Sequence, residues 1–187
     1  MLSCLPLLFT LFAHSQYNNE YNEGIGSLRI GGGYTRDFPG LNGYTLRGEF
    51  SRSLNDYLDG AFAVQRTNAN GYPRTGSVRE YTKATAIDFN LYLLPLKTDV
   101  HVLRLGVGYS FSFYTIRRSY PLSNVGQDDK NYTWPVDDRK GRKSGLSISG
   151  EYEYFLPGSG VSLGIRASLF KAYDQVSYFG PFVGVRL

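Results

Sequence analysis

The sequence predicts an all-β fold, an eight-stranded antiparallel up-and-down transmembrane β-barrel with short periplasmic turns and two long extracellular loops. Three observations lead to this prediction. Apolar and polar residues alternate with a period of two in eight separate segments, as in strands with two unlike faces. Short and long connections alternate between these segments. Tyrosine (16), phenylalanine (12) and glycine (22) are abundant, which suits twisted strands better than helices.

The first four expected strands span residues 26–36, 44–52, 60–68 and 85–94. In each of them large apolar residues recur at every second position, with a few exceptions, and most residues between them are small, polar or charged. The apolar positions are Leu28, Ile30, Tyr34, Tyr44, Leu46, Phe50, Phe62, Val64, Ile87, Phe89, Leu91 and Leu93. The third segment has the weakest alternation of the four.

The fifth segment, "VLRLGVGYSFSFYT" at residues 102–115, shows the pattern most clearly. Its apolar face runs from Leu103 to Phe113 without a break, whereas Arg104 and small residues form the other face. Three further strands are expected at 145–155, 161–170 and 176–187. Pro181 in the last of them cannot donate a ladder hydrogen bond, which predicts a bulge or a position at the end of the barrel.

The connections support a meander that closes into a barrel. The turns "LNDYLD", "LKTDVH" and "PGSG", which follow the second, fourth and sixth strands, are short. The long connections, at about 69–83 and 117–143, follow the third and fifth strands. All short turns therefore fall at one end, which we assign to the periplasm, and both long loops fall at the other.

The first residues predict export. The apolar run "CLPLLFTLFA" is too short to cross a bilayer as a helix, which takes about 20 residues. It is followed by Ala13-His14-Ser15, a small-x-small cleavage box. We therefore expect a signal peptide at 1–15, a periplasmic segment at 16–25 and the barrel at 26–187. Cys4 would leave with the signal peptide, so the mature chain would contain no disulfide.

The polar faces of the strands are expected to line a narrow lumen. Eight strands enclose just enough space to be filled by side chains. Nine interior charges are predicted, five arginines and four acids: Arg29, Arg47, Glu49, Asp88, Arg104, Glu151, Glu153, Arg166 and Arg186. Because unpaired charges are costly away from water, we expect these side chains to pair and to plug the barrel.

The segment "YFGPFVGVRL" at the C-terminal end, with the export signal, the eight strands and the short turns, resembles the small outer-membrane β-barrels. It is similar to the OmpA/OmpX type and to the outer-membrane β-barrel domains of Bacteroidota. The resemblance implies a location in the outer membrane of a Gram-negative bacterium. It also implies contact with membrane lipid and, during biogenesis, with the outer-membrane insertion machinery.

Catalytic and cofactor sites are not predicted. Small barrels of this kind include enzymes that use a histidine base, but His14 lies in the signal peptide and His101 lies at the periplasmic end without a nearby serine. The acid pairs in "QDDKN" and "VDDRK" lack the spacing of a calcium loop, so no metal is expected. Lysine and arginine are mostly scattered singly despite the formal charge of +4, which argues against nucleic acid.

The resulting function hypothesis is a non-enzymatic, monomeric envelope protein with a structural or surface-contact role. A narrow solute channel and a soluble lipocalin-like carrier remain as alternatives, and the carrier requires apolar residues inside the barrel. Six basic residues of the third loop could bridge anionic lipopolysaccharide groups or simply be solvated: Arg117, Arg118, Arg139, Lys140, Arg142 and Lys143.

Overall fold

A computed structural model describes residues 26–187, apart from 39, 73–77, 120–135 and 173. The signal peptide and periplasmic segment predicted at 1–15 and 16–25 lie outside the described residues. Eight strands pair in sequence order, and β8 pairs with β1, so the sheet is a closed antiparallel barrel. The strands are β1 (Ser27–Asp37), β2 (Asn42–Asn55), β3 (Leu58–Gly71), β4 (Glu80–Lys97), β5 (His101–Ser119), β6 (Val136–Phe155), β7 (Val161–Lys171) and β8 (Gln175–Arg186).

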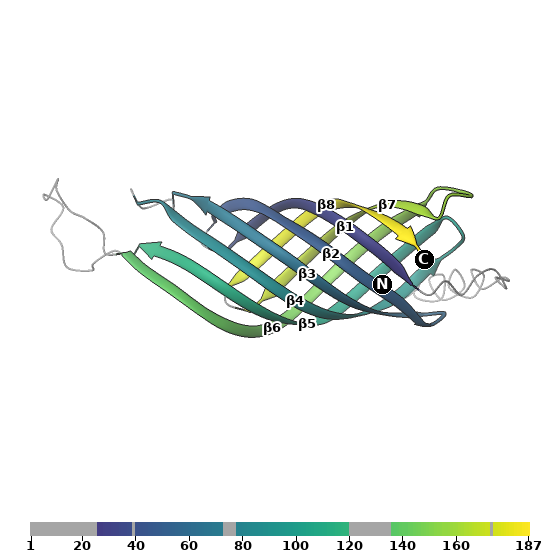
Figure 1. Cartoon of the computed structure of the whole chain (residues 1–187), viewed down its shortest axis with the longest axis horizontal. Coiled ribbons are helices and arrows are strands. Elements are labelled where there is room, and N and C mark those ends of the chain that lie inside the picture. Colours follow the sequence, from purple (N-terminus) through teal and green to yellow (C-terminus); the bar gives the residue numbers. More distant parts are fainter. Residues whose placement is uncertain (1–25, 39, 73–77, 120–135, 173) are drawn as a thin grey trace, which may run out of the picture.

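The barrel is elongated, and its two ends differ (Figure 1). The connections β2–β3, β4–β5 and β6–β7 are short turns at the end where β1 begins and β8 ends. There the backbone N–H of Leu187 donates to the carbonyl of Gly26 at 2.8 Å, which joins the residues that flank the start of β1 and the end of β8. We call this the short-turn end. At the opposite, long-loop end, β5 and β6 project beyond β1, β7 and β8.

Strands β5 and β6 are longer than their alternation predicts. They have 19 and 20 residues and remain paired as far as Ser119 opposite Val136. The loop expected at 117–143 is therefore wrong in its extent. Most of residues 136–144 are exposed, and apart from Val136 and Gly141 their side chains are polar on both faces of the strand, so a period of two cannot be seen. We call the paired segments 112–119 and 136–143 the β5–β6 ribbon.

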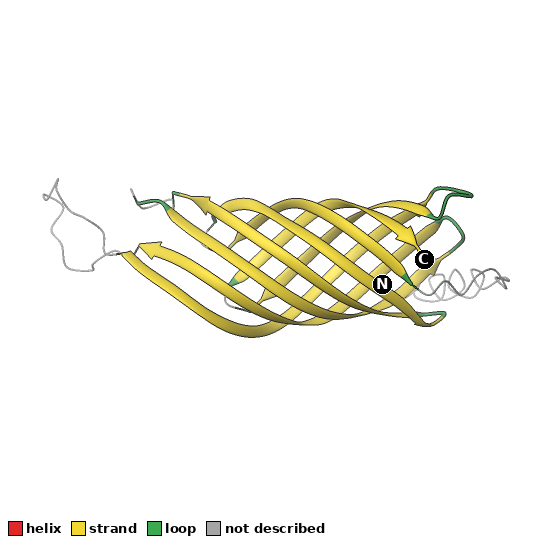
Figure 2. Cartoon of the chain, in the orientation of Figure 1, coloured by secondary structure: helices red, strands yellow, loops and turns green. Residues whose placement is uncertain are grey.

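Large apolar residues point out of the barrel, as the alternation predicts. On β5, for example, Leu105 is 51% exposed and Val107 is 60% exposed. The same holds for the outward positions on the other strands, which together form an apolar band around the barrel. The lipocalin-like alternative requires the reverse arrangement and is wrong. All the regular structure in the described residues is strand (Figure 2), and none of it is a helix that could cross a membrane.

Pro181 lies within β8, opposite Ile165 of β7, and not at a bulge or at a barrel end as predicted. On its other side, pairing with β1 lapses between Phe182 and Phe179 and then resumes in the same register. The missing N–H of proline is thus accommodated by a local gap in the ladder. Gly33 of β1 lies against Gly180 there, and a Cβ on Gly33 would come within 2.4 Å of the Gly180 Cα.

Candidate functional site: the charged lumen

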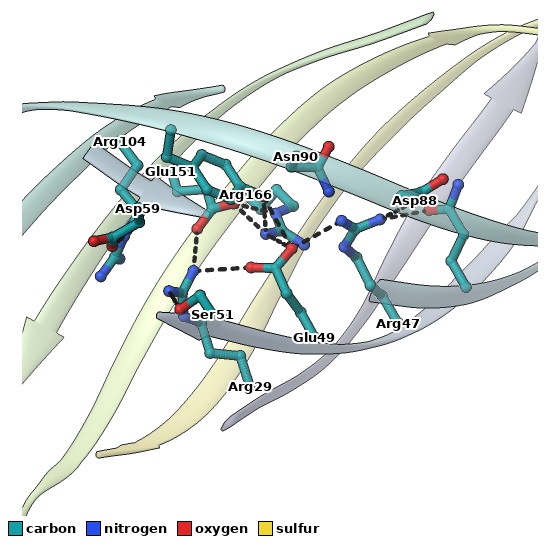
Figure 3. Close-up of polar contacts among 12 residues, drawn as sticks. Arg29, Arg47, Glu49, Ser51, Asp59, Asp88, Asn90, Arg104, Glu151 and Arg166 are labelled. Carbon is teal, nitrogen blue, oxygen red and sulfur yellow. Dashed lines mark hydrogen bonds and ion pairs between the residues drawn. The ribbon is translucent and has the colours of Figure 1, made fainter. Parts of the chain in front are cut away.

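The centre of the lumen holds a connected network of charged side chains (Figure 3). They occupy inward positions of seven strands, because alternate residues of a strand point to the same face. Four arginines and five carboxylates belong to this network, and each is at most 6% exposed: Arg29, Arg47, Arg104, Arg166, Glu49, Asp59, Asp88, Glu151 and Glu153. Water is therefore largely replaced here by ion pairs.

Two arginines and two glutamates form the middle of the network. Arg29 Nη1 donates to Glu49 Oε1 at 3.0 Å and to Glu151 Oε2 at 2.8 Å. Arg166 Nη2 donates to Glu49 Oε2 at 2.7 Å and also to Glu151 Oε1. These four residues come from β1, β2, β6 and β7, and Figure 3 shows them pointing toward one another. They thus bridge strands across the barrel axis.

Further pairs extend the network toward both ends. Arg47 donates to Glu49 Oε2 at 2.8 Å and to Asp88. Toward the short-turn end, Arg104 donates to Asp59 Oδ2 at 3.1 Å and to Glu153. Each arginine therefore meets at least two carboxylates, and each carboxylate meets at least one arginine. Such pairing compensates the cost of removing the charges from water.

One neutral residue is built into the network. Tyr92 of β4 is fully buried, and its hydroxyl donates to Glu49 Oε2 at 2.9 Å. Arg166 Nη2 in turn donates to the Tyr92 oxygen at 2.8 Å. The ring of Tyr92 occupies lumen space that shorter side chains would leave open, while its hydroxyl remains satisfied.

The structure places eight of the nine expected interior charges in this network. The prediction is wrong for the ninth, Arg186, which is exposed. Its guanidinium lies 4.1 Å from the ring centroid of Phe155. Arg186 is the last residue of β8, so no further barrel wall covers it. Sequence reasoning missed Asp59, which it placed in a short turn. The alternation could have shown this, because Asp59 lies two residues before Ala61 and therefore shares the inward face of β3 with it.

A second polar cluster closes the long-loop end. Arg118 Nη2 donates to Asp37 Oδ2 and to Asp174 Oδ2, both at 3.0 Å, and to Thr82 Oγ1 at 2.8 Å. Arg118 was expected in a surface loop, but it is an inward residue of β5. Glu80 accepts bonds from the backbone and side chain of Ser119 nearby. We call these residues the outer cap.

The described residues do not group three or more histidine, cysteine, aspartate or glutamate side chains where a metal could bind. Asp138 of "VDDRK" pairs with Arg117, and Asp137 pairs with Arg139. The pair in "QDDKN" lies outside the described residues. His101 faces outward at the short-turn end, where Nδ1 and the Tyr152 hydroxyl are 2.7 Å apart.

No family model matches the chain, and no curated protein sequence matches it either. Among solved structures, it is similar to Ail, the attachment invasion locus protein of Yersinia pestis. That match has a TM-score of 0.54 and 14% identity and covers 89% of this chain and all (100%) of Ail. The chain has the fold of the small eight-stranded outer-membrane β-barrels.

A second Ail structure, in complex with the heparin analogue sucrose octasulfate, matches with a TM-score of 0.52 and 13% identity. It too covers 89% of this chain and 100% of Ail. Neisserial surface protein A matches with a TM-score of 0.49 and 15% identity, covering 87% of this chain and 96% of that protein. At these identities the likeness is one of fold.

Proposed function

We propose that this protein is a non-enzymatic integral outer-membrane β-barrel with a plugged lumen, and that it acts structurally and through contacts at its long-loop end. The observation that carries this proposal is the ion-pair network in the lumen. Guanidinium and carboxylate groups from opposite sides of the barrel meet there at hydrogen-bond distance. A pathway for solutes would have to break several of these bonds.

The outward apolar band supports the location in a membrane. A surface of this kind is stable against lipid, and a closed ring of strands leaves no unpaired edge within the bilayer. An outer membrane is the location that this fold and the predicted signal peptide together favour. Cleavage before Gln16, use of the insertion machinery, a monomeric state and membership of the OmpA/OmpX or Bacteroidota type belong to the same proposal.

The β5–β6 ribbon supports a contact role. It extends beyond the other strands on the side that we assign to the exterior, and its residues Arg139, Lys140, Arg142 and Lys143 give it a basic character. Ail, by its name an attachment protein, has been solved with a sulfated sugar analogue. The shared fold and the basic ribbon make anionic surface groups, including those of lipopolysaccharide, the favoured partners here.

The surroundings of His101 support a non-enzymatic role. Its ring lies between Tyr152 and Tyr154, with centroids 6.0 and 5.3 Å away. Aromatic and amphipathic side chains at this height suit the interface between membrane and water. The described contacts of the His101 ring include no serine that it could activate.

Conductance of the purified protein in planar bilayers tests the plug directly. We expect no steady current, because the paired side chains leave no continuous water file. Large, reproducible, ion-selective openings would overturn the plug and favour the channel alternative.

The orientation is tested separately on intact cells, where a cysteine placed at Lys140 should react with a membrane-impermeant maleimide. Reaction only after the envelope is opened would invert the proposed orientation.

A further inference from the structure

Three cations on the outer surface of β4–β6 form no direct ion pair with a carboxylate among the described residues: Lys83, Lys140 and Arg142. Asp138, which acts on Lys140 at longer range, is itself paired with Arg117. All three are exposed and lie on one face of the sheet. Lys83 is paired with Thr115 of β5, and Thr115 is paired with Lys140 of β6. Arg142 lies opposite Phe113, two residues along β5 from Thr115. The three cations therefore surround one threonine.

Neighbouring basic residues do not belong to this patch. Arg118 points inward into the outer cap, and Arg117 is neutralised by Asp138, with Nη2 and Oδ2 2.7 Å apart. Arg139 and Lys143 lie opposite Ile116 and Ser112, which are buried inward residues of β5. Of the six residues that the sequence suggested for anion binding, only Lys140 and Arg142 are in this outward patch, and Lys83 joins them.

The patch lies directly beside the apolar band. The guanidinium of Arg142 is 5.8 Å from the ring centroid of Phe113, and Phe111 follows on the same face toward the middle of the barrel. Both rings are exposed and point outward, and they pack edge to face with centroids 5.1 Å apart. Positive charge is thus held at the edge of a surface that suits acyl chains.

Lys83 and Lys140 lie on either side of Thr115, with β5 between their strands, and Lys140 and Arg142 follow each other on the same face of β6. Their like charges repel, so this cluster lowers the stability of the free barrel. A bound anion would reverse the effect. A phosphate group carries up to two negative charges and three strong acceptor oxygens. Arginine can bind it through two parallel hydrogen bonds, lysine supplies point charges, and the Thr115 hydroxyl offers one more donor.

We infer that Lys83, Lys140 and Arg142, with Thr115 between them, form a binding site for the phosphorylated headgroup of a glycolipid in the outer leaflet. The acyl chains of this lipid lie along Phe113 and Phe111. This inference rests on the proposed membrane location. The lipid is favoured over free phosphate because the apolar half of the site adjoins the charged half, and a free ion would use only the latter.

Native mass spectrometry of the full mature protein in detergent tests this site, with bisphosphorylated lipid A, the same lipid without phosphates, and inorganic phosphate as probes. The test variant replaces Lys83, Lys140 and Arg142 with glutamine. The control variant removes the same charge elsewhere, at Arg52, Lys97 and Lys171, which are also exposed. We expect the test variant to bind lipid A roughly 10- to 100-fold more weakly, and the control to bind it like the wild type.

Equal binding of lipid A by the test variant and the wild type would overturn the site. So would equal binding of the lipid without phosphates, or wild-type binding of inorganic phosphate as tight as that of lipid A. Unchanged heat-modifiable migration on gels verifies that both variants fold. If the wild type fails to insert into vesicles at all, the proposed membrane location is refuted instead, so the two failures are distinguishable.

Discussion

The lumen and the β5–β6 ribbon use the same residue types in opposite ways. In the lumen, Arg166 is buried and contacts two glutamates and a tyrosine hydroxyl. On the ribbon, Arg117 and Asp138 form a bidentate pair, yet their side chains are 40% and 45% exposed. The geometry of the ribbon pair is at least as good as that of the Arg166 contacts. The surroundings of the ribbon pair differ, because water can replace either of its two partners.

Ion pairs of similar geometry therefore differ in how much they stabilise the protein. Exposed ion pairs contribute about 0–1 kcal/mol, whereas removing one partner of a buried pair costs about 3–5 kcal/mol because a charge is left uncompensated. The lumen network should therefore determine whether the barrel stays closed and folded. The ribbon should determine what the protein meets outside, because its charges remain available to partners.

The largest effect is expected from Glu151→Ala in the lumen. The substitution removes one of the two carboxylate partners of Arg166 and one of the three carboxylate partners of Arg29 in the middle of the lumen. We expect a loss of about 3–5 kcal/mol in the free energy of unfolding, measured by urea titration of reversible folding into lipid vesicles. The variant should still show no steady conductance. A loss below about 1 kcal/mol would mean that the network does not hold the barrel together.

A second prediction concerns the outward face. Leu105→Arg places a charge on the apolar band and should cost about 2–4 kcal/mol near the bilayer midplane. Ser110→Ala, on the inward face of the same strand, should be mild, because the Ser110 hydroxyl has only a 3.4 Å contact with Ser112. The same folding assay measures both. Equal effects would show that the faces of β5 are assigned to the wrong sides.

The sides of the strands could be predicted from the sequence, but the partners of the charges could not. A period of two is enough to point Arg29 inward and Leu105 outward. The bond from Arg29 to Glu151 spans 122 positions of the chain and crosses the lumen. It depends on strand shear, which sets which inward residues share a level, and the alternation within one strand carries no information about shear.

The ends of the strands were also beyond the reach of alternation. Asp59 appeared to belong to a turn because "LNDYLD" breaks the alternation with Asn55 and Asp56 side by side, although it is an inward residue of β3. Arg118 appeared to belong to a loop because the segment beyond the apolar band lacks a lipid-facing side. Alternation is visible only where the outward face of a strand contacts lipid and the inward face contacts the polar lumen. Where the outward residues are small or polar as well, as at Gly60, Thr115 and Arg117, strands continue without an alternating pattern.

The outer cap lies between the lumen network and the ribbon, and an intermediate effect is expected there. Asp37→Asn removes one of the two carboxylates that Arg118 contacts and weakens the bond from Thr82, 2.6 Å long. Asp174 still pairs with Arg118, so the charge stays partly compensated. We expect a loss of about 1–2 kcal/mol in the free energy of unfolding in vesicles. A loss as large as that of Glu151→Ala would make the outer cap part of the main plug.

The smallest effect is expected from Asp138→Asn on the ribbon. The hydrogen bond from Arg117 lowers the pKa of the Asp138 carboxyl below its usual range. A lowered acid pKa stabilises the fold above the unfolded pKa and loses this contribution as the pH falls through the folded pKa. Between pH 5 and pH 8, roughly, the pair is thus fully formed, but water screens it. We expect Asp138→Asn to cause no resolvable change in unfolding free energy at neutral pH. In the wild type, the titration of the Asp138 carboxyl, followed by NMR in micelles, should show the lowered pKa. A loss comparable with that of Asp37→Asn would mean that the ribbon is shielded from water, and the contrast between ribbon and lumen would fail.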